Sequence, residues 1–256
     1  MENGEIILGI CKQAFIPVRK DPHERAEMVT QILFGEYVRI EDEEGLWLFI
    51  RALRDEYEGW IDRNCIERAE KVADHPFIVA RNNILIRNLT DQQPAHLPIG
   101  ASVPKISDQK FTMSGTLYEI DDTESVVRPR EIAPEDMIGD LVSIPYIWGG
   151  RCGFGFDCSG LTQFLGRLSG KEIPRDASEQ SALGTTLSFT SEAKTGDFAF
   201  FDNIEGMINH VGMMIGNDRI IHASGMVRLD RIDQQGIYNE KLGTYTHKLR
   251  VIKRIA

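Results

Sequence analysis

The chain has 256 residues, of which 42% are hydrophobic and 27% charged, a composition typical of a folded protein with room for two or three domains. The formal net charge of −10 argues against nucleic acid or an anionic membrane as a partner, because no basic stripe offsets the acidic excess. The N-terminus lacks the basic segment and cleavage site of a signal peptide, and no apolar run is long enough to span a membrane. We therefore expect a cytoplasmic protein, or a secreted one if a leader has been removed.

Residues 1–71 contain several short segments with the alternation of a β-strand, separated by turn residues. The predicted strands are Ala14–Arg19, Glu36–Glu41, Leu46–Arg51 and a strand beginning at Tyr57–Ile61. Many short strands with turns between them favour a small β-barrel. Residues 72–128 are also rich in strands but broken by prolines, with predicted strands at 77–80, 84–87 and 114–120. We interpret this second block as another, more divergent barrel.

Residues 129–256 mix helices and strands, which predicts an α+β domain. The expected helices are a short one over Ala133–Val142, one that begins near Cys158 and a short one after the loop at Ile173–Asp176. The expected strands are Thr195–Phe201, His210–Ile215, Arg219–Ser224 and Leu249–Arg254.

The segment Pro145–Leu168 organises this domain. It is rich in glycine and delivers Cys158 to the start of a predicted helix, whose apolar residues Leu161, Phe164, Leu165 and Leu168 recur at helical spacing on one face. A thiol at a helix N-terminus lies among unpaired backbone N–H groups and at the positive end of the dipole, and both favour the thiolate. Cys158 is therefore predicted to be a nucleophile.

A nucleophilic cysteine needs an imidazole base, and the base needs a polar partner that orients it. His210 and His222 lie on consecutive predicted strands joined by Gly216-Asn217-Asp218. A three-residue loop would pair Ile215 with Arg219 and Gly212 with His222, which places both histidines on one face as diagonal neighbours. In this register His210 would be the base and His222 its orienting partner.

Some of the cysteines and histidines allow an alternative interpretation as a metal site, and the other histidines and the tryptophans are given no functional role. Cys152, Cys158, His210 and His222 form an alternative zinc set, although their spacing is not that of Cys-x-x-Cys clips. We prefer Cys152 as a bystander rather than a disulfide partner of Cys158. The remaining histidines, His23, His75, His96 and His247, are interpreted as surface or core residues, and the tryptophans, Trp47, Trp60 and Trp148, as packing anchors.

The ordered motifs of residues 129–256 resemble those of the NlpC-type cell-wall cysteine peptidases, which have a papain-like core. The matching segments are Tyr146-x-Trp148-Gly149-Gly150, Phe156-Asp157-Cys158-Ser159-Gly160-Leu161, Ile173-Pro174-Arg175-Asp176, Gly196-Asp197, Asn209-His210-Val211-Gly212 and Ile221-His222-Ala223. The resemblance implies cleavage of an amide bond between γ-D-glutamate and a diamino acid in murein stem peptides, with no cofactor and no metal. It also implies Cys158 as nucleophile, His210 as base and His222 as third residue, with Tyr146 beside the reacting carbonyl.

The N-terminal block resembles bacterial SH3-like domains, so the whole chain is similar to the γ-D-glutamyl-L-diamino acid endopeptidases, in which two SH3-like barrels precede the papain-like domain. That subgroup takes peptides with a free N-terminal L-alanine, such as L-Ala-γ-D-Glu-diamino acid, and is associated with murein recycling. By this resemblance Glu27 and Tyr57, with Asp157 as a third partner, would hold the substrate ammonium. The same resemblance makes Ser159, Asp176 and Ser178 weaker predictions for the D-glutamate carboxylate.

The sequence also allows two other functions. The Cys-His chemistry would also suit an acyltransferase or amidase that acts on other acyl groups. Alternatively, the barrels would anchor an inactive domain to the cell wall.

Overall fold

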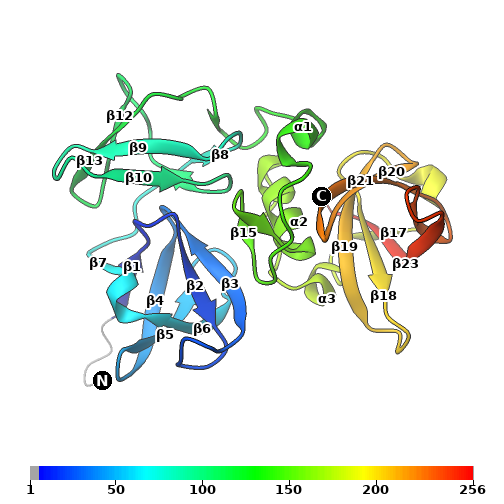
Figure 1. The fold of residues 1–256 in the computed structure, drawn as a ribbon, viewed down its shortest axis with the longest axis horizontal. Coiled ribbons are helices and arrows are strands. Elements are labelled where there is room, and N and C mark those ends of the chain that lie inside the picture. Colours follow the sequence, from blue (N-terminus) through cyan, green and yellow to red (C-terminus); the bar gives the residue numbers. More distant parts are fainter. Residues whose placement is uncertain (1–5, 256) are drawn as a thin grey trace. The chain divides into compact units, whose positions relative to one another are not determined.

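The structure, a computed structural model, describes residues 6–255. The described residues form two compact units (Figure 1). The N-terminal unit consists of residues 6–128 together with Cys152–Phe154, and the C-terminal unit consists of Pro129–Arg151 and residues 155–255.

The first part of the N-terminal unit is a seven-stranded antiparallel sheet with the order β3-β2-β6-β5-β4-β1-β7. Its strands are β1 (Ile7–Ile10), β2 (Phe15–Arg19), β3 (Met28–Leu33), β4 (Tyr37–Glu44), β5 (Trp47–Ala52), β6 (Glu58–Asp62) and β7 (Glu67–Ala69), and the short helix η1 (Arg63–Cys65) lies between the last two. Alternation places Val38, Ile40, Leu48, Ile50 and Ile61 in one buried cluster. The four predicted strands are present as β2, β4, β5 and β6.

The second part of this unit has two small sheets, with orders β10-β9-β13-β12 and β11-β8-β14. Their strands are β8 (Phe77–Val79), β9 (Ile84–Asn88), β10 (Pro94–Leu97), β11 (Ser102–Val103), β12 (Lys110–Met113), β13 (Thr116–Ile120) and β14 (Val126–Val127). Ile10, Phe34 and Tyr37 from the first part join the hydrophobic cluster of the second part. The two strand-rich blocks therefore share a core within one compact unit.

The C-terminal unit combines short helices with a closed sheet. Its helices are η2 (Pro134–Met137), α1 (Ile138–Leu141), α2 (Cys158–Leu168), α3 (Ala177–Gln180) and η3 (Thr190–Glu192). Its strands are β15 (Arg151–Cys152), β16 (Gly155–Phe156), β17 (Thr185–Leu187), β18 (Phe198–Asp202), β19 (Ile208–Ile215), β20 (Arg219–Ser224), β21 (Met226–Ile232), β22 (Gly236–Asn239) and β23 (Thr244–Arg254). The main sheet has the order β17-β23-β18-β19-β20-β21-β22, and pairing between β22 and β23 closes six of these strands into a barrel.

Helix α2 begins at Cys158, as its sequence predicts, but its surroundings differ from the prediction. The Asp157 side chain caps the first turn by accepting from the Gly160 N–H, and Gly170 follows the last turn with a φ of +73°. Every residue of α2 is buried, and the helix packs on β19 and β20. The expected amphipathic helix is thus a central one, and buried Thr162, Gln163 and Arg167 occupy its polar positions.

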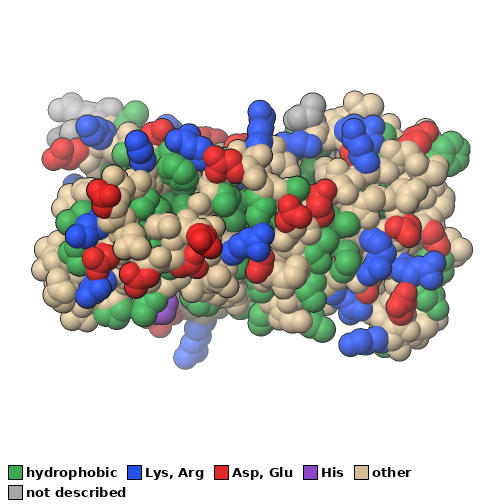
Figure 2. Space-filling model, turned by 90° about the horizontal axis from the view of Figure 1, so that it is seen from above, with side chains coloured by type: hydrophobic (Ala, Val, Ile, Leu, Met, Phe, Trp, Pro, Cys, Tyr) green, Lys and Arg blue, Asp and Glu red, His purple; other side chains and the backbone are tan. Residues whose placement is uncertain are grey.

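Trp148 is a second departure from the sequence interpretation. Its side chain is 60% exposed, so it does not anchor packing in this unit. Acidic and basic side chains are interspersed over the face drawn in Figure 2, without an extended patch of one sign. No helix in the described part of the chain is long and apolar enough to cross a membrane.

Candidate active site

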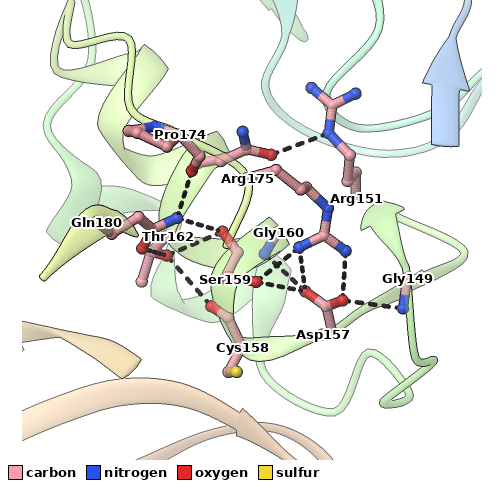
Figure 3. Close-up of polar contacts among 11 residues, drawn as sticks. Gly149, Arg151, Asp157, Cys158, Ser159, Gly160, Thr162, Pro174, Arg175 and Gln180 are labelled. Atoms are coloured by element: carbon pink, nitrogen blue, oxygen red, sulfur yellow. Dashed lines mark hydrogen bonds and ion pairs between the residues drawn. The ribbon is translucent and has the colours of Figure 1, made fainter. Parts of the chain in front are cut away.

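Cys158 is the first residue of α2 and its side chain is 8% exposed. In Figure 3 the sulfur points away from the polar network that surrounds the start of the helix. The pairing of β19 with β20 ends at Gly212 and His222. Val211 lies on β19 directly before Gly212, and its backbone makes a hydrogen bond with the Cys158 thiol. The nucleophile predicted from the sequence therefore lies beside the strand that carries His210.

Burial of Cys158 opposes the thiolate that its place at the helix start favours. Burial raises the pKa of the Cys158 thiol to about 11, and the Asp157 carboxylate adds to the rise. The hydrogen bond with the Val211 backbone, the Arg175 charge and the Ser159 backbone lower the pKa without offsetting these effects. The cost of desolvating a sulfur anion therefore works against the thiolate and favours the neutral thiol.

Asp157 and Arg175 hold the start of α2 in place (Figure 3). Both side chains are buried, and Arg175 donates to the two carboxylate oxygens of Asp157. The same carboxylate accepts from the Gly149 N–H at 2.9 Å and the Gly160 N–H at 2.7 Å. Arg175 Nη1 also donates to the Ser159 hydroxyl at 2.6 Å. This network positions the residues on either side of Cys158 and uses the polar groups of Asp157 and Ser159 internally.

Gln180, which the sequence analysis did not single out, extends the same support from α3. Its side chain is fully buried, accepts from the Thr162 hydroxyl at 2.8 Å and donates to the carbonyl oxygens of Ser159 and Pro174. An uncharged residue in a short helix has no sequence signal beyond its position after the Pro174-Arg175-Asp176 motif. Its role follows from three converging hydrogen bonds.

The predicted hairpin register is confirmed. Gly212 pairs with His222 and Ile215 pairs with Arg219, so His210 and His222 lie on one face of the sheet. Their rings approach edge to face, and His210 Nε2 lies 2.9 Å from His222 Nδ1. A Cβ on Gly212 would come within 2.8 Å of Ile220 and of the Ile221 carbonyl, so the pairing requires glycine there.

Asp230, a carboxylate that the sequence analysis missed, lies beside His222 and forms with His210 and His222 a row of three hydrogen-bonded side chains. His222 Nε2 lies 3.1 Å from Oδ2 of Asp230, and the other carboxylate oxygen, Oδ1, accepts from Arg228 Nη2 at 3.0 Å. Because a carboxylate only accepts, His222 carries its proton on Nε2 and accepts through Nδ1, and His210 donates from Nε2. This leaves the Nδ1 lone pair of His210 available for a proton.

The pKa values of these groups follow from their burial. Burial, followed by repulsion from His222 and His247, lowers the pKa of His210 well below its ordinary value. Burial also lowers the pKa of His222, although the hydrogen bond with Asp230 opposes this shift. Burial opposes ionisation of Asp230, yet hydrogen bonds from His222 and Arg228 lower its pKa to about 2. At neutral pH the row holds two neutral imidazoles and one carboxylate.

His247 is the clearest correction to the sequence interpretation, which left it as an ordinary surface or core residue. It lies on β23, and its ring stacks on the His210 ring with centroids 4.1 Å apart and planes 25° apart. Among the described residues, the group that could hold a metal ion is His210, His222 and His247. The alternative set of Cys152, Cys158, His210 and His222 is therefore not assembled. Within residues 6–255 the cysteines form no disulfide.

Tyr146 lies within the electrostatic reach of the nucleophile. The pKa of its hydroxyl is raised by burial first and by the Cys158 and Asp157 charges second. Its backbone N–H donates to the Gly225 carbonyl at 3.1 Å, which fixes the segment that precedes α2. The predicted neighbour of the reacting carbonyl is thus near the thiol.

The remaining predicted substrate residues are spread over both units. Asp176 caps α3 through its carbonyl and is half-buried, and Ser178 is exposed on the same helix. Glu27 is exposed just before β3, and Tyr57 is half-buried just before β6, both in the N-terminal unit. Their predicted contacts with a substrate stay predictions.

Comparisons with known proteins identify the domains. The model of the NlpC/P60 family matches residues 143–246, and the model of the bacterial dipeptidyl-peptidase Sh3 domain matches residues 18–66. The catalytic region of this chain is an NlpC/P60 cysteine peptidase domain. The resemblance expected from the motifs is thereby confirmed, as is the SH3-like domain that precedes it.

The chain is also similar to known proteins over most of its length. It is 28% identical over 212 residues to the gamma-D-glutamyl-L-lysine dipeptidyl-peptidase of Bacillus subtilis (strain 168), which covers 76% of this chain and 71% of the relative. A relative of the same name from Bacillus cereus (strain ATCC 10987 / NRS 248) is 28% identical over 230 residues, 77% of this chain and 67% of the relative. The crystal structure of an NlpC/P60 family protein from Bacillus cereus ATCC 10987 matches 96% of this chain and 99% of that chain, with a TM-score of 0.81 and 18% identity. At that identity the likeness concerns the fold alone.

Proposed function

We propose that the chain hydrolyses the amide bond between γ-D-glutamate and a diamino acid in peptides derived from peptidoglycan, as part of murein-peptide recycling. The observation that carries the proposal is the row His210–His222–Asp230 on the strands beside the Cys158 thiol. The names of the two relatives, gamma-D-glutamyl-L-lysine dipeptidyl-peptidases, support the choice of bond. A papain-like division of roles, with the nucleophile on a helix and the base on a sheet, agrees with this arrangement.

In the first step the neutral thiol gives its proton to His210 Nδ1 as its sulfur attacks the carbonyl carbon of the γ-glutamyl amide. The new positive charge on His210 is shared through its Nε2–H with His222, whose other nitrogen faces the ionised Asp230. His222 and Asp230 therefore orient the base and stabilise its protonated form. The oxyanion that forms on the carbonyl would be stabilised by the Tyr146 hydroxyl and the Cys158 N–H.

In the second step the carbon–nitrogen bond breaks, and His210 returns its proton to the leaving amine of the diamino acid. The acyl group remains on Cys158 as a thioester. A water molecule then gives a proton to His210 and attacks the thioester carbon, which releases the acid. The thiolate that leaves takes the proton back from His210, and the resting neutral pair is restored.

The requirement for a free N-terminal alanine is a finer part of the proposal. It rests on the resemblance of Glu27 and Tyr57 to residues that hold an ammonium. Asp157, the third predicted partner, already accepts from Gly149, Ser159, Gly160 and Arg175, and this supports a positioning role for it. Ser159 is likewise held by Arg175.

The test is a product analysis with matched peptides. We expect the purified chain to split L-Ala-γ-D-Glu-L-Lys, or its diaminopimelate counterpart, into L-Ala-D-Glu and the free diamino acid, as detected by mass spectrometry. The N-acetylated peptide should be cleaved at least an order of magnitude more slowly, because it lacks the ammonium. Equal cleavage of the two peptides would contradict the roles of Glu27 and Tyr57 but not the choice of bond.

Other outcomes would identify a different function. Transfer of the L-Ala-D-Glu acyl group to an added amine in place of water would indicate an acyltransferase. Sedimentation with murein sacculi without hydrolysis of any peptide would indicate a wall-binding module.

A further inference from the structure

We propose that His210, His222 and His247 form a binding site for a divalent transition-metal ion, zinc above all, and that the bound ion switches the peptidase off. The metal site is inferred from the histidine cluster alone. Its inhibitory effect rests on the function proposed above.

The three histidines bring their ring nitrogens close together. One ring nitrogen from each histidine lies within 4.8 Å of the other two, and His210 Nε2 and His222 Nδ1 are 2.9 Å apart. Nitrogens bound to one tetrahedral zinc at about 2.0–2.1 Å are separated by roughly 3.4 Å. To bind one ion, the His210–His222 nitrogen pair would open by about 0.5 Å, and the His247 ring, which now stacks on His210, would turn its nitrogen toward the same ion.

Asp230 adds a feature that metal-binding histidines commonly have. It accepts from His222 Nε2 at 3.1 Å and so directs the Nδ1 lone pair toward the cluster. A histidine ligand whose second nitrogen donates to a carboxylate is the usual arrangement around zinc. Arg228 balances the charge of Asp230 through a 3.0 Å hydrogen bond, so the three rings lie next to a neutral pair and not next to a free cation.

His247 would provide the third ligand, and it lies where an ion would enter the cluster. Its ring stacks on that of His210 and lies at 78° to that of His222, with centroids 4.1 Å and 5.6 Å away. It is half-buried, whereas His210 is 6% and His222 1% exposed, so an ion would enter past His247. Three imidazoles suit zinc, copper or nickel better than magnesium or calcium, and they leave one position for water.

Metal binding and catalysis would compete for the same imidazole. An ion on Nε2 of His210 replaces the hydrogen bond to His222, and the ring proton must then move to Nδ1. Nδ1 is the atom that accepts the thiol proton in the proposed mechanism, so the metal-bound ring is no base. Cys158 is not part of the ligand group, and the ion would act without binding the sulfur.

The first experiment measures binding without catalysis. The full-length Cys158→Ala chain is stripped with a chelator, and ZnCl2 is titrated into it by calorimetry. We expect one ion per chain, and in the unaltered chain Co²⁺ should give tetrahedral absorption bands without sulfur charge transfer. His247→Ala in this background should weaken binding by at least an order of magnitude, and Asp230→Asn should weaken it by roughly ten- to a hundredfold. His96→Ala, which removes an exposed histidine outside the cluster, is the matched control.

Zinc affinity that is unchanged by His247→Ala would overturn the site. So would binding to the unaltered chain that disappears in Cys158→Ala, because the thiol would then be the ligand.

The second experiment measures inhibition. Zinc should stop peptide hydrolysis by the unaltered chain, and a chelator should restore it. For each protein, inhibition is expressed relative to its own metal-free rate. The zinc concentration that halves this rate should be higher for His247→Ala than for the unaltered chain. Full activity with the site saturated would overturn the switch. If the chain hydrolysed no peptide at all, the proposed function would fail while the binding titration still decided the metal site.

Discussion

At the scale of single residues, the site depends on how burial sets the protonation of Cys158 and His210. Burial raises the pKa of the thiol and lowers the pKa of the imidazole, so it favours the neutral form of both groups. Proton transfer then accompanies attack on the substrate and does not precede it. This differs from the ion pair that a cysteine at a helix start would favour.

The first prediction concerns alkylation of the resting thiol. With a pKa of about 11, the Cys158 thiolate is scarce at neutral pH, so its reaction with iodoacetamide should keep rising up to at least pH 10. The rate is measured by mass spectrometry of the Cys158 peptide, in the presence of a chelator. A rate that reaches its plateau below pH 8 would show that the resting thiol is already ionised.

Which site residues the sequence could reveal depended on how local their signal was. Cys158 is marked by its glycine-rich approach and helix start, and His222 follows from His210 once the three-residue loop fixes the register. Asp230 and His247 lie on β21 and β23, beyond the hairpin that the register argument covers. Only the pairing of β20 with β21 and the barrel closure bring them to the histidines.

At the scale of elements, the entry into α2 is the most constrained backbone of the site. A Cβ on Gly160 would lie 2.1 Å from the carbonyl oxygen of Gly150, and that carbonyl accepts from the Asp157 N–H at 3.0 Å. The turn before the nucleophile and the first turn of α2 therefore pack backbone against backbone.

We expect Gly160→Ala to lower the free energy of unfolding by about 1–3 kcal/mol, because the clash involves backbone and cannot be relieved by a rotamer change. Gly139→Ala is the matched control, since a Cβ there meets nothing within 4 Å and Gly139 lies in helix α1. That variant should be neutral or slightly stabilising. Urea denaturation of both variants checks the contrast, and equal stability of the two would contradict the packing described at Gly160.

The elements themselves were only partly predictable. The spacing of Leu161, Phe164, Leu165 and Leu168 locates α2, but it does not reveal that Thr162, Gln163 and Arg167 are buried too. Those polar residues are accommodated by partners distant in sequence, such as Gln180 for Thr162 and Arg151 for Gln163. An apolar stripe in the sequence indicates one packed face of a helix. A central helix is packed on several faces, and the stripe does not reveal the others.

At the scale of the whole molecule, four of the six histidines have pKa values that folding lowers: His75, His210, His222 and His247. Burial is the first cause in each case, and for His247 it brings the pKa to about 4. The folded chain therefore binds fewer protons than the unfolded chain below pH 6.5. Stability that these groups contribute is fully present above pH 6.5 and is lost as the pH falls toward the lowered values.

The free energy of unfolding should accordingly fall between pH 7 and pH 5, on the order of 1 kcal/mol per pH unit or more. Urea midpoints at the two pH values, taken in a chelator so that no metal stabilises the histidines, measure the change. A stability that is constant or higher at pH 5 would contradict the neutral state of the buried imidazoles.

The organisation of the N-terminal half shows the limit of sequence patterns at this scale. Alternation and turns locate four strands of the first block and three of the second, but they do not reveal the shared core. Phe34 packs edge-on against Phe111 and Tyr118, with ring centroids 6.3 Å and 5.6 Å away. Contacts across such a separation in sequence leave no periodic signal, so two blocks of strands suggest two barrels whether or not their cores are joined.

The central claim is that the Cys158 sulfur performs the attack, and the most direct test compares two cysteine variants. The rate of release of the diamino acid from L-Ala-γ-D-Glu-L-Lys is measured by mass spectrometry for the unaltered chain, Cys158→Ala and Cys152→Ala. Cys152 is a buried cysteine six positions away that has no proposed role in catalysis. Cys158→Ala, correctly folded by circular dichroism, should lose all measurable release, while Cys152→Ala should retain most of it. Release by Cys158→Ala at the unaltered rate would contradict the account.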